Sequence, residues 1–355
     1  MRTSTHILFM AVLISSCTVS AFAQEKLAKE LYSKGAMLYQ QGRYGEAAKV
    51  AKEALAVTEK AFGQDHPTVA ISLNLLGLLN QAQGKYSEAE LLYERALAIG
   101  EKALGKNHSH VATYLNNLAA VYQAQGKYSE VEPLHKRALK IREEAYGRDH
   151  FHVAESLSNL ASVYQAQGKY VEAEPLYKRT LKIRERSFGP DHPHVAESLS
   201  NLASVYKTQD KYAEAEPLYK RALVIDEKAL GREHPEVAKD LNNLADLYRI
   251  QGKYSEAESL HKRALKILEN GLGPDHLHVA ESLSNLASVY QTQGKYAEAE
   301  PLYKRALAIR EKVLGKDHHD VATVCESMAE LYRKLGKGDE AEKLEARARK
   351  IRSNQ

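Results

Sequence analysis

The stretch HPHVAESLSNLASVY (His192–Tyr206) is followed by the turn KTQDK and then by YAEAEPLYKRALVIDEKAL (Tyr212–Leu230). In both segments apolar residues such as Val195 and Leu199 recur at the three-and-four spacing of one helical face. The second segment stops before Gly231, a residue that commonly ends helices. The stretch therefore predicts two helices joined by a short turn, which we call helix A and helix B.

The same pattern returns along the chain with a period of 42 residues. The third position of a Gly-Lys-Tyr-like triplet falls at Tyr44, Tyr86, Tyr128, Tyr170, Tyr212, Tyr254, Tyr296 and Gly338. A strict period of 20 to 50 residues predicts a stacked array of one supersecondary unit. No linker-like stretch interrupts the period, so we expect one continuous all-α array over residues 24–355. Its repeats 1 to 8 are predicted at about 25–62, 66–104, 108–146, 150–188, 192–230, 234–272, 276–314 and 318–353.

The residue pattern resembles that of a known repeat family, although its period exceeds the usual 34 residues. The signature of a small residue, aromatics and alanines is matched by Leu202, Ala203, Tyr206, Tyr212, Ala215, Tyr219 and Ala222. These residues resemble the tetratricopeptide repeat (TPR), and the AEAEPLYKRALVI run with the Gly-x-Asp-His-Pro loop is similar to the 42-residue repeats of kinesin light chains. The resemblance implies a right-handed superhelical solenoid of about eight stacked helix-turn-helix units.

Two departures from the repeat predict local structure. Asp210 replaces the turn glycine found at positions 42, 84, 126, 168, 252, 294 and 336, and we expect it to adopt a left-handed conformation. In the last repeat Glu345 stands where repeat 7 has Tyr303, and residues 339–352 are rich in Lys, Arg and Glu. This composition predicts the polar outer face that a terminal repeat requires.

Composition and charge exclude several classes of function. The net charge is +4, from 50 Lys and Arg against 46 Asp and Glu, and the two signs interleave within each helix. A nucleic-acid partner is therefore not expected. Catalysis needs one asymmetric site, whereas every Ser, His and Glu has near-copies in neighbouring repeats. We expect neither an enzyme nor a bound cofactor.

The first 23 residues predict export from a bacterial cytoplasm. Arg2 precedes the apolar run Ile7–Ile14, and Ala21–Ala23 form an A-x-A cleavage signal of a signal peptide. The expected location is periplasmic or secreted. In an alternative interpretation, Leu13–Cys17 resembles a lipobox, and a lipid on Cys17 would anchor the mature protein to a membrane. No later segment has the roughly 18 apolar residues that span a bilayer.

Histidine and cysteine offer the remaining candidates for chemistry. A histidine precedes helix A in repeats 2 to 8, at positions 66, 108, 150, 192, 234, 276 and 318, and His110, His152, His194 and His278 follow two residues later. The His-x-His spacing could ligate zinc. Capping of the helix start is the simpler explanation, so no metal site is predicted. Cys325 occupies the column of Leu199 and is expected to be a buried core residue.

Polar residues on helix A, on the face opposite the apolar stripe, form the candidate binding site. One column contains Asn117, Asn159, Asn201, Asn243 and Asn285; the next contains Asn116, Ser158, Ser200, Asn242 and Ser284, with Gln123, Gln165 and Gln291 further along. The family resemblance implies a concave groove in which such asparagines hydrogen-bond the backbone of an extended peptide, since an amide both donates and accepts. The predicted function is a protein-binding scaffold with an unidentified protein or peptide partner. The alternative is a self-associating structural spacer.

Overall fold

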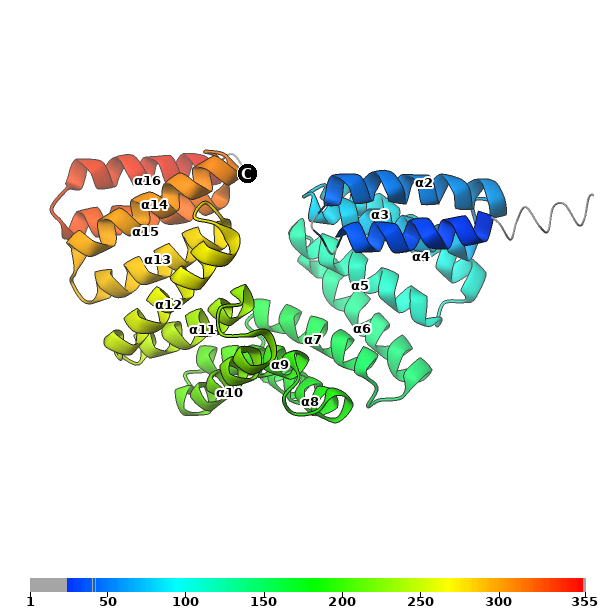
Figure 1. Ribbon diagram of the computed structural model, residues 1–355, viewed down its shortest axis with the longest axis horizontal. Helices are drawn as coiled ribbons and strands as arrows, with labels where there is room; N and C mark the ends of the chain where they lie inside the picture. Colours follow the sequence, from blue (N-terminus) through cyan, green and yellow to red (C-terminus); the bar gives the residue numbers. More distant parts are fainter. Residues whose placement is uncertain (1–23, 40, 42, 354–355) are drawn as a thin grey trace, which may run out of the picture. The chain divides into compact units, whose positions relative to one another are not determined.

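Every regular element of this protein is helical in the part of the chain that the computed structural model describes, residues 24–39, 41 and 43–353 (Figure 1). A first helix covers residues 24–39. The later helices A are α3 (Pro67–Ala82), α5 (Ser109–Ala124), α7 (Phe151–Ala166), α9 (Pro193–Thr208), α11 (Pro235–Ile250), α13 (Leu277–Thr292) and α15 (His319–Lys334). The helices B are α2 (Tyr44–Phe62), α4 (Tyr86–Leu104), α6 (Tyr128–Tyr146), α8 (Tyr170–Phe188), α10 (Tyr212–Leu230), α12 (Tyr254–Leu272), α14 (Tyr296–Leu314) and α16 (Gly338–Ser353). The prediction of an all-α chain of helix-turn-helix repeats is confirmed.

The chain divides into two compact units, and each contains several repeats. The N-terminal unit ends at Lys169 and contains the first helix and α2 to α7, whereas the C-terminal unit begins at Tyr170 and contains α8 to α16. Within each unit every labelled helix packs against the next one along the chain. Helices A of successive repeats also meet, as α3 does with α5 and α9 with α11. Each repeat is therefore covered by its neighbours in sequence, as expected for a stacked array.

The later helices A begin after the capping histidines, and helices B end before the glycines that the sequence indicated. The histidine before each of the seven later helices A accepts a hydrogen bond at Nδ1 from the backbone N–H two residues on, over 3.1–3.4 Å. This contact satisfies one of the N–H groups that a helix start leaves without an intrahelical partner. After helix B the chain turns at glycines with positive φ, such as Gly231 at 92°. The capping explanation of the histidines is confirmed.

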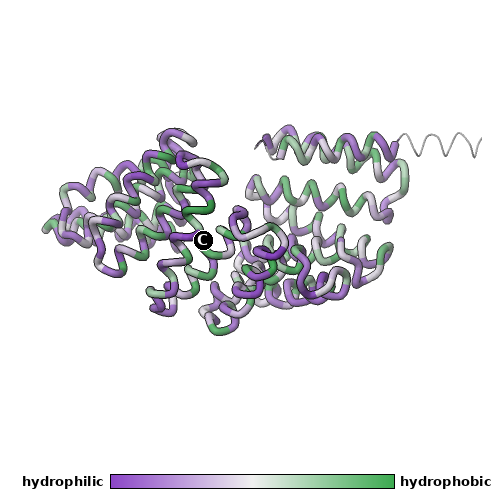
Figure 2. The backbone as a smooth tube through the Cα atoms, turned by 60° about the horizontal axis from the view of Figure 1, so that its bottom comes forward, coloured by the Kyte–Doolittle hydropathy of each residue, from purple (hydrophilic) through white to green (hydrophobic). Residues whose placement is uncertain are grey.

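The core is built from the apolar stripes of helices A and B. In the C-terminal unit Ala203 and Ala215 are fully buried beside Tyr219, Leu244 and Leu247. Figure 2 shows apolar and polar stretches alternating along each helix, as the three-and-four spacing requires. The small alanines allow two helices to approach closely, while the tyrosine fills the space towards the next repeat.

The structure confirms both predicted departures from the repeat, the conformation of Asp210 and the polar face of the last helix. Asp210 has φ 59° and is the non-glycine residue with positive φ among those described, whereas Gly42 of repeat 1 lies outside them. In α16 Ala341, Ala348 and Ile351 are buried while most other side chains are exposed, so the last repeat does present a polar outer face. Cys325 is a buried free thiol, as expected for a core residue.

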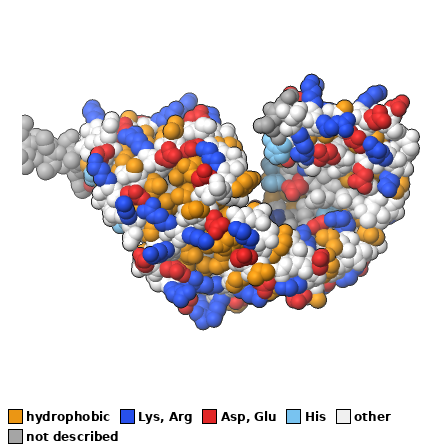
Figure 3. All heavy atoms as spheres, turned by 180° about the vertical axis from the view of Figure 1, so that it is seen from behind, with side chains coloured by type: hydrophobic (Ala, Val, Ile, Leu, Met, Phe, Trp, Pro, Cys, Tyr) orange, Lys and Arg blue, Asp and Glu red, His pale blue; other side chains and the backbone are white. Residues whose placement is uncertain are grey.

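Charges of both signs are interleaved over the face shown in Figure 3. Ion pairs also join consecutive repeats, for example Lys228–Asp191 and Arg263–Glu227. Within the described part of the chain, the helices are too short or too polar to cross a membrane. The predicted signal peptide and the alternative lipid site at Cys17 lie outside the described residues.

Candidate functional site

The predicted asparagine column lies on successive helices A and is half-buried at every position: Asn117 and Asn159 in the N-terminal unit, and Asn201, Asn243 and Asn285 in the C-terminal unit. Asn117 donates from Nδ2 to Oδ1 of Asn74 on the preceding helix A, over 2.7 Å. Of the described residues, none is hydrogen-bonded to the side-chain amides of Asn159, Asn201, Asn243 and Asn285. These four amides retain both a donor and an acceptor for a ligand.

Asn74 extends this asparagine column, which we call the asparagine ladder, by one more helix A. Its contact with Asn117 was not predicted from the sequence. Its neighbour Leu75 occupies the column position in repeat 2 and is buried, with 4% of its surface exposed. The amide of Asn74, one residue earlier, takes over the contact to Asn117. The only sequence signal was an asparagine in the adjacent column, which does not by itself reveal a contact between helices.

Most side chains of the adjacent column are buried or hydrogen-bonded to other residues of the chain. They therefore do not line an open groove, which corrects the prediction made from the sequence. Asn116 is 5% exposed; its Nδ2 donates to the Ser156 hydroxyl at 3.3 Å, and its Oδ1 lies 2.8 Å from Nδ1 of His135. Asn242 makes the same contact with His261 at 2.8 Å. The serines of this column are also buried or bonded internally: Ser158 is 9% exposed, Ser200 donates to Asp240, and Ser284 donates to a backbone carbonyl.

The buried histidines account for Asn116 and Asn242 in this column, whereas Asn74 occurs in a repeat that has Tyr93 at the helix B position. Repeats with Tyr177, Tyr219 or Tyr303 at the helix B position carry serine opposite, whereas the two repeats with histidine carry asparagine. Burial lowers the pKa of both His135 and His261 to about 4, so the imidazoles are neutral near pH 7. A neutral Nδ1–H can then donate to the asparagine oxygen.

The glutamines of the predicted site lie near the ends of helices A and are all half-buried: Gln123, Gln165 and Gln291. Oε1 of Gln291 is buried without a hydrogen-bond partner among the described residues. Gln251 and Gln293 cap the ends of α11 and α13, and the Oε1 atom of each is also buried without a hydrogen-bond partner among the described residues. These capping glutamines were not predicted, because a residue just beyond a helix pattern gives no signal of burial.

A hollow of about 640 Å³ lies in the N-terminal unit between the first helix, α2, α3 and α5. Its walls are largely apolar and include Tyr32, Phe62 and Ile71, together with Asn74 of the ladder. Tyr114 also lines it; this side chain is 3% exposed and its hydroxyl has no partner among the described residues. Tyr114 stands where repeats 2, 4, 5 and 7 carry serine, and its ring leaves no room for a Cβ at Gly100, which would lie 2.9 Å from it. The hollow was not predicted because it depends on this pair of exchanges.

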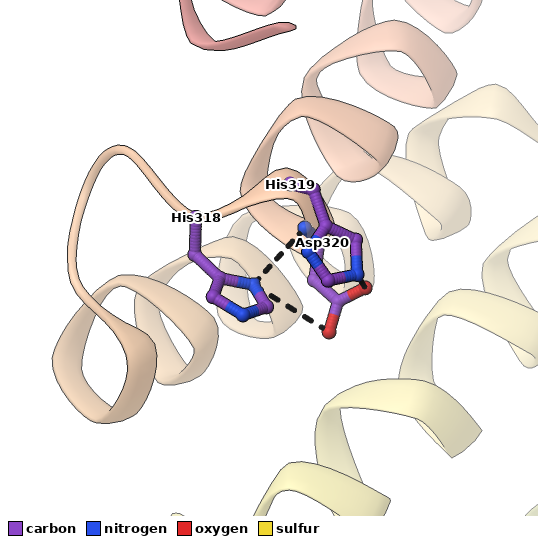
Figure 4. A group of neighbouring side chains, drawn as sticks. All are labelled: His318, His319 and Asp320. Atoms are coloured by element: carbon purple, nitrogen blue, oxygen red, sulfur yellow. Dashed lines mark hydrogen bonds and ion pairs between the residues drawn. The ribbon is translucent and has the colours of Figure 1, made fainter. Parts of the chain in front are cut away.

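The histidine loops have a structural role that already uses one ring nitrogen. Figure 4 shows the group of His318, His319 and Asp320. One imidazole nitrogen of each histidine and one carboxylate oxygen of the aspartate lie within 4.8 Å of one another. His318 Nδ1 accepts the backbone N–H of Asp320 at 3.2 Å and thereby caps α15. The capping histidines of repeats 2, 4 and 5 also stack on the last aromatic residue of the preceding helix B, as His192 does on Phe188 at 4.8 Å.

This architecture defines a class, the helical repeat proteins built from two-helix units. The profile of the tetratricopeptide repeat matches residues 28–102, 92–144, 110–186, 152–228, 196–270 and 278–354. The chain therefore belongs to the tetratricopeptide repeat family. The predicted family is confirmed.

Solved structures agree with this assignment. BtubC (BKLC) from P. vanneervenii is 27% identical, with a TM-score of 0.52, and the match covers 65% of this chain and 91% of that one. A kinesin-light-chain-like repeat protein from Podosopora anserina is also 27% identical over 57% of this chain and 96% of its own, with a TM-score of 0.49. The quorum sensor NprR from B. thuringiensis shares the fold at 16% identity and a TM-score of 0.67, covering 91% and 87%. Among curated protein sequences no relative matches.

Proposed function

We propose that this chain is a non-catalytic scaffold that holds an extended segment of another protein against the helix A face. The asparagine column carries this proposal. Four half-buried amides with free donors and acceptors recur on successive helices A. An extended peptide backbone presents one donor and one acceptor per residue, so amide side chains at regular spacing complement it.

The contact set of the proposed groove is narrower than the sequence suggested. In the N-terminal unit it contains Asn117 and Asn159 with Gln123 and Gln165, and in the C-terminal unit Asn201, Asn243 and Asn285 with Gln291. Asn116 and Asn242 are left out because their amide oxygens lie against buried histidines. The hollow lined by Tyr114 lies beside Asn74 and offers apolar surface at the N-terminal end of the same ladder.

Export belongs to the proposal and rests on the sequence of residues 1–23. The partner would then be a protein of the cell envelope or the exterior. Mass spectrometry of the mature N-terminus distinguishes cleavage after Ala23 from lipidation of Cys17. A mature chain that retains Met1 would contradict both forms of export.

Site-specific photo-crosslinking tests the binding face. A photoreactive amino acid at Asn201 on helix A is compared with the same group at Val224, which is 62% exposed on helix B of the same repeat. The proposal predicts adducts with another protein from position 201 and none from position 224. Adducts from position 224 alone would place the binding face elsewhere.

Self-association is the competing function, and sedimentation separates it from partner binding. A monomer at high concentration, together with adducts of a different mass from position 201, supports the scaffold. Oligomers whose adducts contain only this chain would favour the structural spacer instead.

A further inference from the structure

One position near the end of helix B carries a buried positive charge in several repeats. The Nη1 atoms of Arg142 and Arg184 lie 3.0 Å from backbone carbonyl oxygens at the start of the next helix A, those of His152 and His194. Arg310 makes the corresponding contact at 3.2 Å. The fold thus places a cation between the end of helix B and the first turn of the following helix A.

In repeats 3 and 4 the oxygens around this cation form a defined set. Arg142 also contacts the Ser156 hydroxyl at 3.1 Å and a carboxylate oxygen of Glu155 at 2.8 Å. Arg184 repeats both contacts, at 3.0 and 2.9 Å. The two arginine side chains are only 5% and 10% exposed. The site therefore takes a positive charge from bulk water and surrounds it with oxygen ligands.

At the junction between repeats 5 and 6 the equivalent positions carry the opposite charge. Asp226 replaces the arginine, Asp240 replaces the serine and Lys239 replaces the glutamate. Asp240 is 4% exposed, and its Oδ1 accepts a hydrogen bond from the Ser200 hydroxyl at 3.0 Å. Its Oδ2 is buried without a partner among the described residues, as is Oδ1 of Asp226. The two carboxyl groups lie within hydrogen-bond reach of each other.

No ion pair is formed with either carboxyl group of this pair in the described part of the chain, although burial raises the pKa of both and the charge of Lys239 partly offsets that rise. Lys239 is exposed and forms no ion pair with either carboxylate among the described residues. The carbonyl of Glu236, which corresponds to those of His152 and His194, remains at the start of α11. A buried carboxylate beside a half-buried one is unfavourable while both are charged, so the pair either shares a proton or binds a cation.

We propose that Asp226, Asp240 and the carbonyl of Glu236 bind one hard divalent cation, with calcium the best match. Carboxylate and carbonyl oxygens are the ligands that calcium prefers, and no sulfur or imidazole group belongs to the set. A small ion can reach the pair past Asp226, which is half-buried. This inference goes beyond the proposed peptide binding and does not depend on it.

Calcium titration of the full-length protein at pH 8.5 tests this site. Burial and the adjacent Asp226 raise the pKa of Asp240 to about 7, so this pH removes competition from protons. Isothermal titration should give one calcium ion per chain. At a calcium concentration 100-fold above Kd the melting temperature should rise by about 4 °C or more.

Two variants and one control make the result specific. Asp240→Ser restores the residue that repeats 2, 4, 5 and 7 carry at this position, so the variant should fold, and Asp226→Asn preserves the shape of the side chain; both should lose calcium binding. Asp275→Ser removes an exposed loop carboxylate and should keep it. Equal calcium effects on all four proteins, or none on the wild type, would overturn the proposal. A melting temperature that responds to pH but not to calcium would show that the pair holds a shared proton only.

Discussion

At the scale of single residues, the repeats differ from one another through paired exchanges. His135 occurs with Asn116 and His261 with Asn242, whereas Tyr177 occurs with Ser158. In the histidine repeats, imidazole and amide meet at 2.8 Å. Each histidine–asparagine pair acts as a unit, since a buried imidazole needs a hydrogen-bond partner and has it on the facing helix of the same repeat.

These histidines predict a loss of stability in mild acid. Burial lowers both pKa values to about 4, from an ordinary value of 6.5, so the folded chain keeps the rings neutral while the unfolded chain takes up protons. Their contribution is present above pH 6.5 and is lost as the pH falls from 6.5 towards 4. At pH 5 each histidine should cost about 2 kcal/mol relative to pH 7.

Denaturant unfolding at pH 7 and pH 5 checks this. The matched variant exchanges both pairs for those of other repeats, His135→Tyr with Asn116→Ser and His261→Tyr with Asn242→Ser. The wild type should lose more stability than the variant between the two pH values. Equal losses would show that the histidines do not titrate in this range.

Asp210 predicts a stabilising substitution. Its φ of 59° is unfavourable for a residue with a Cβ, and the other described repeats use glycine at this turn. Asp210→Gly should raise the free energy of unfolding by roughly 0.5 to 1 kcal/mol, less whatever the hydrogen bond from the Tyr212 hydroxyl contributes. An unchanged or lower melting temperature would contradict this account of the turn.

Residue-scale features divide clearly into those the sequence could predict and those it could not. The conformation of Asp210 was predictable because glycine occupies the equivalent turn positions. The contact between Asn116 and His135 was not, since it joins positions 19 residues apart on facing helices. Periodicity shows which residues share a face but not which polar atoms meet.

At the scale of helices, the close seam between A and B depends on alanine. Ala222 is fully buried against Val195 and Leu199. Ala222→Leu should overpack this seam and lower the free energy of unfolding by about 1 to 3 kcal/mol. Val224→Leu, at a 62% exposed position of the same helix, is the control and should change little. Equal effects of the two changes would mean that the seam is loosely packed.

Helices of consecutive repeats are also tied by a recurring acidic residue. Glu216 pairs with Lys220 at 2.7 Å on its own helix and with Lys253 of the next repeat at 3.1 Å, and it accepts the Tyr248 hydroxyl at 3.2 Å. Hydrogen bonding to Lys220 first, and then to Lys253, lowers the pKa of Glu216 to about 2. The helix bounds were predictable from apolar spacing and caps, whereas this contact between repeats needed the three-dimensional arrangement.

At the scale of the whole chain, the 42-residue period predicted the family and the helical fold. It also predicted one continuous array, and the structure describes two compact units that meet in sequence between Lys169 and Tyr170. The period is unchanged on both sides of this point. What the repeats bind could not be predicted, because near-copies of one sequence conceal which exchanges serve packing and which serve a partner.

The affinity for the crosslinked partner, measured by calorimetry, tests the central claim most directly. The variant with Asn159, Asn201 and Asn243 all changed to Ala is compared with a helix B variant in which exposed Val171, Glu214 and Glu256 are changed to Ala. Losing three hydrogen bonds should weaken binding by about 10- to 100-fold. The account predicts that weakening for the asparagine variant alone, with its melting temperature nearly unchanged. Wild-type affinity in the asparagine variant would contradict it.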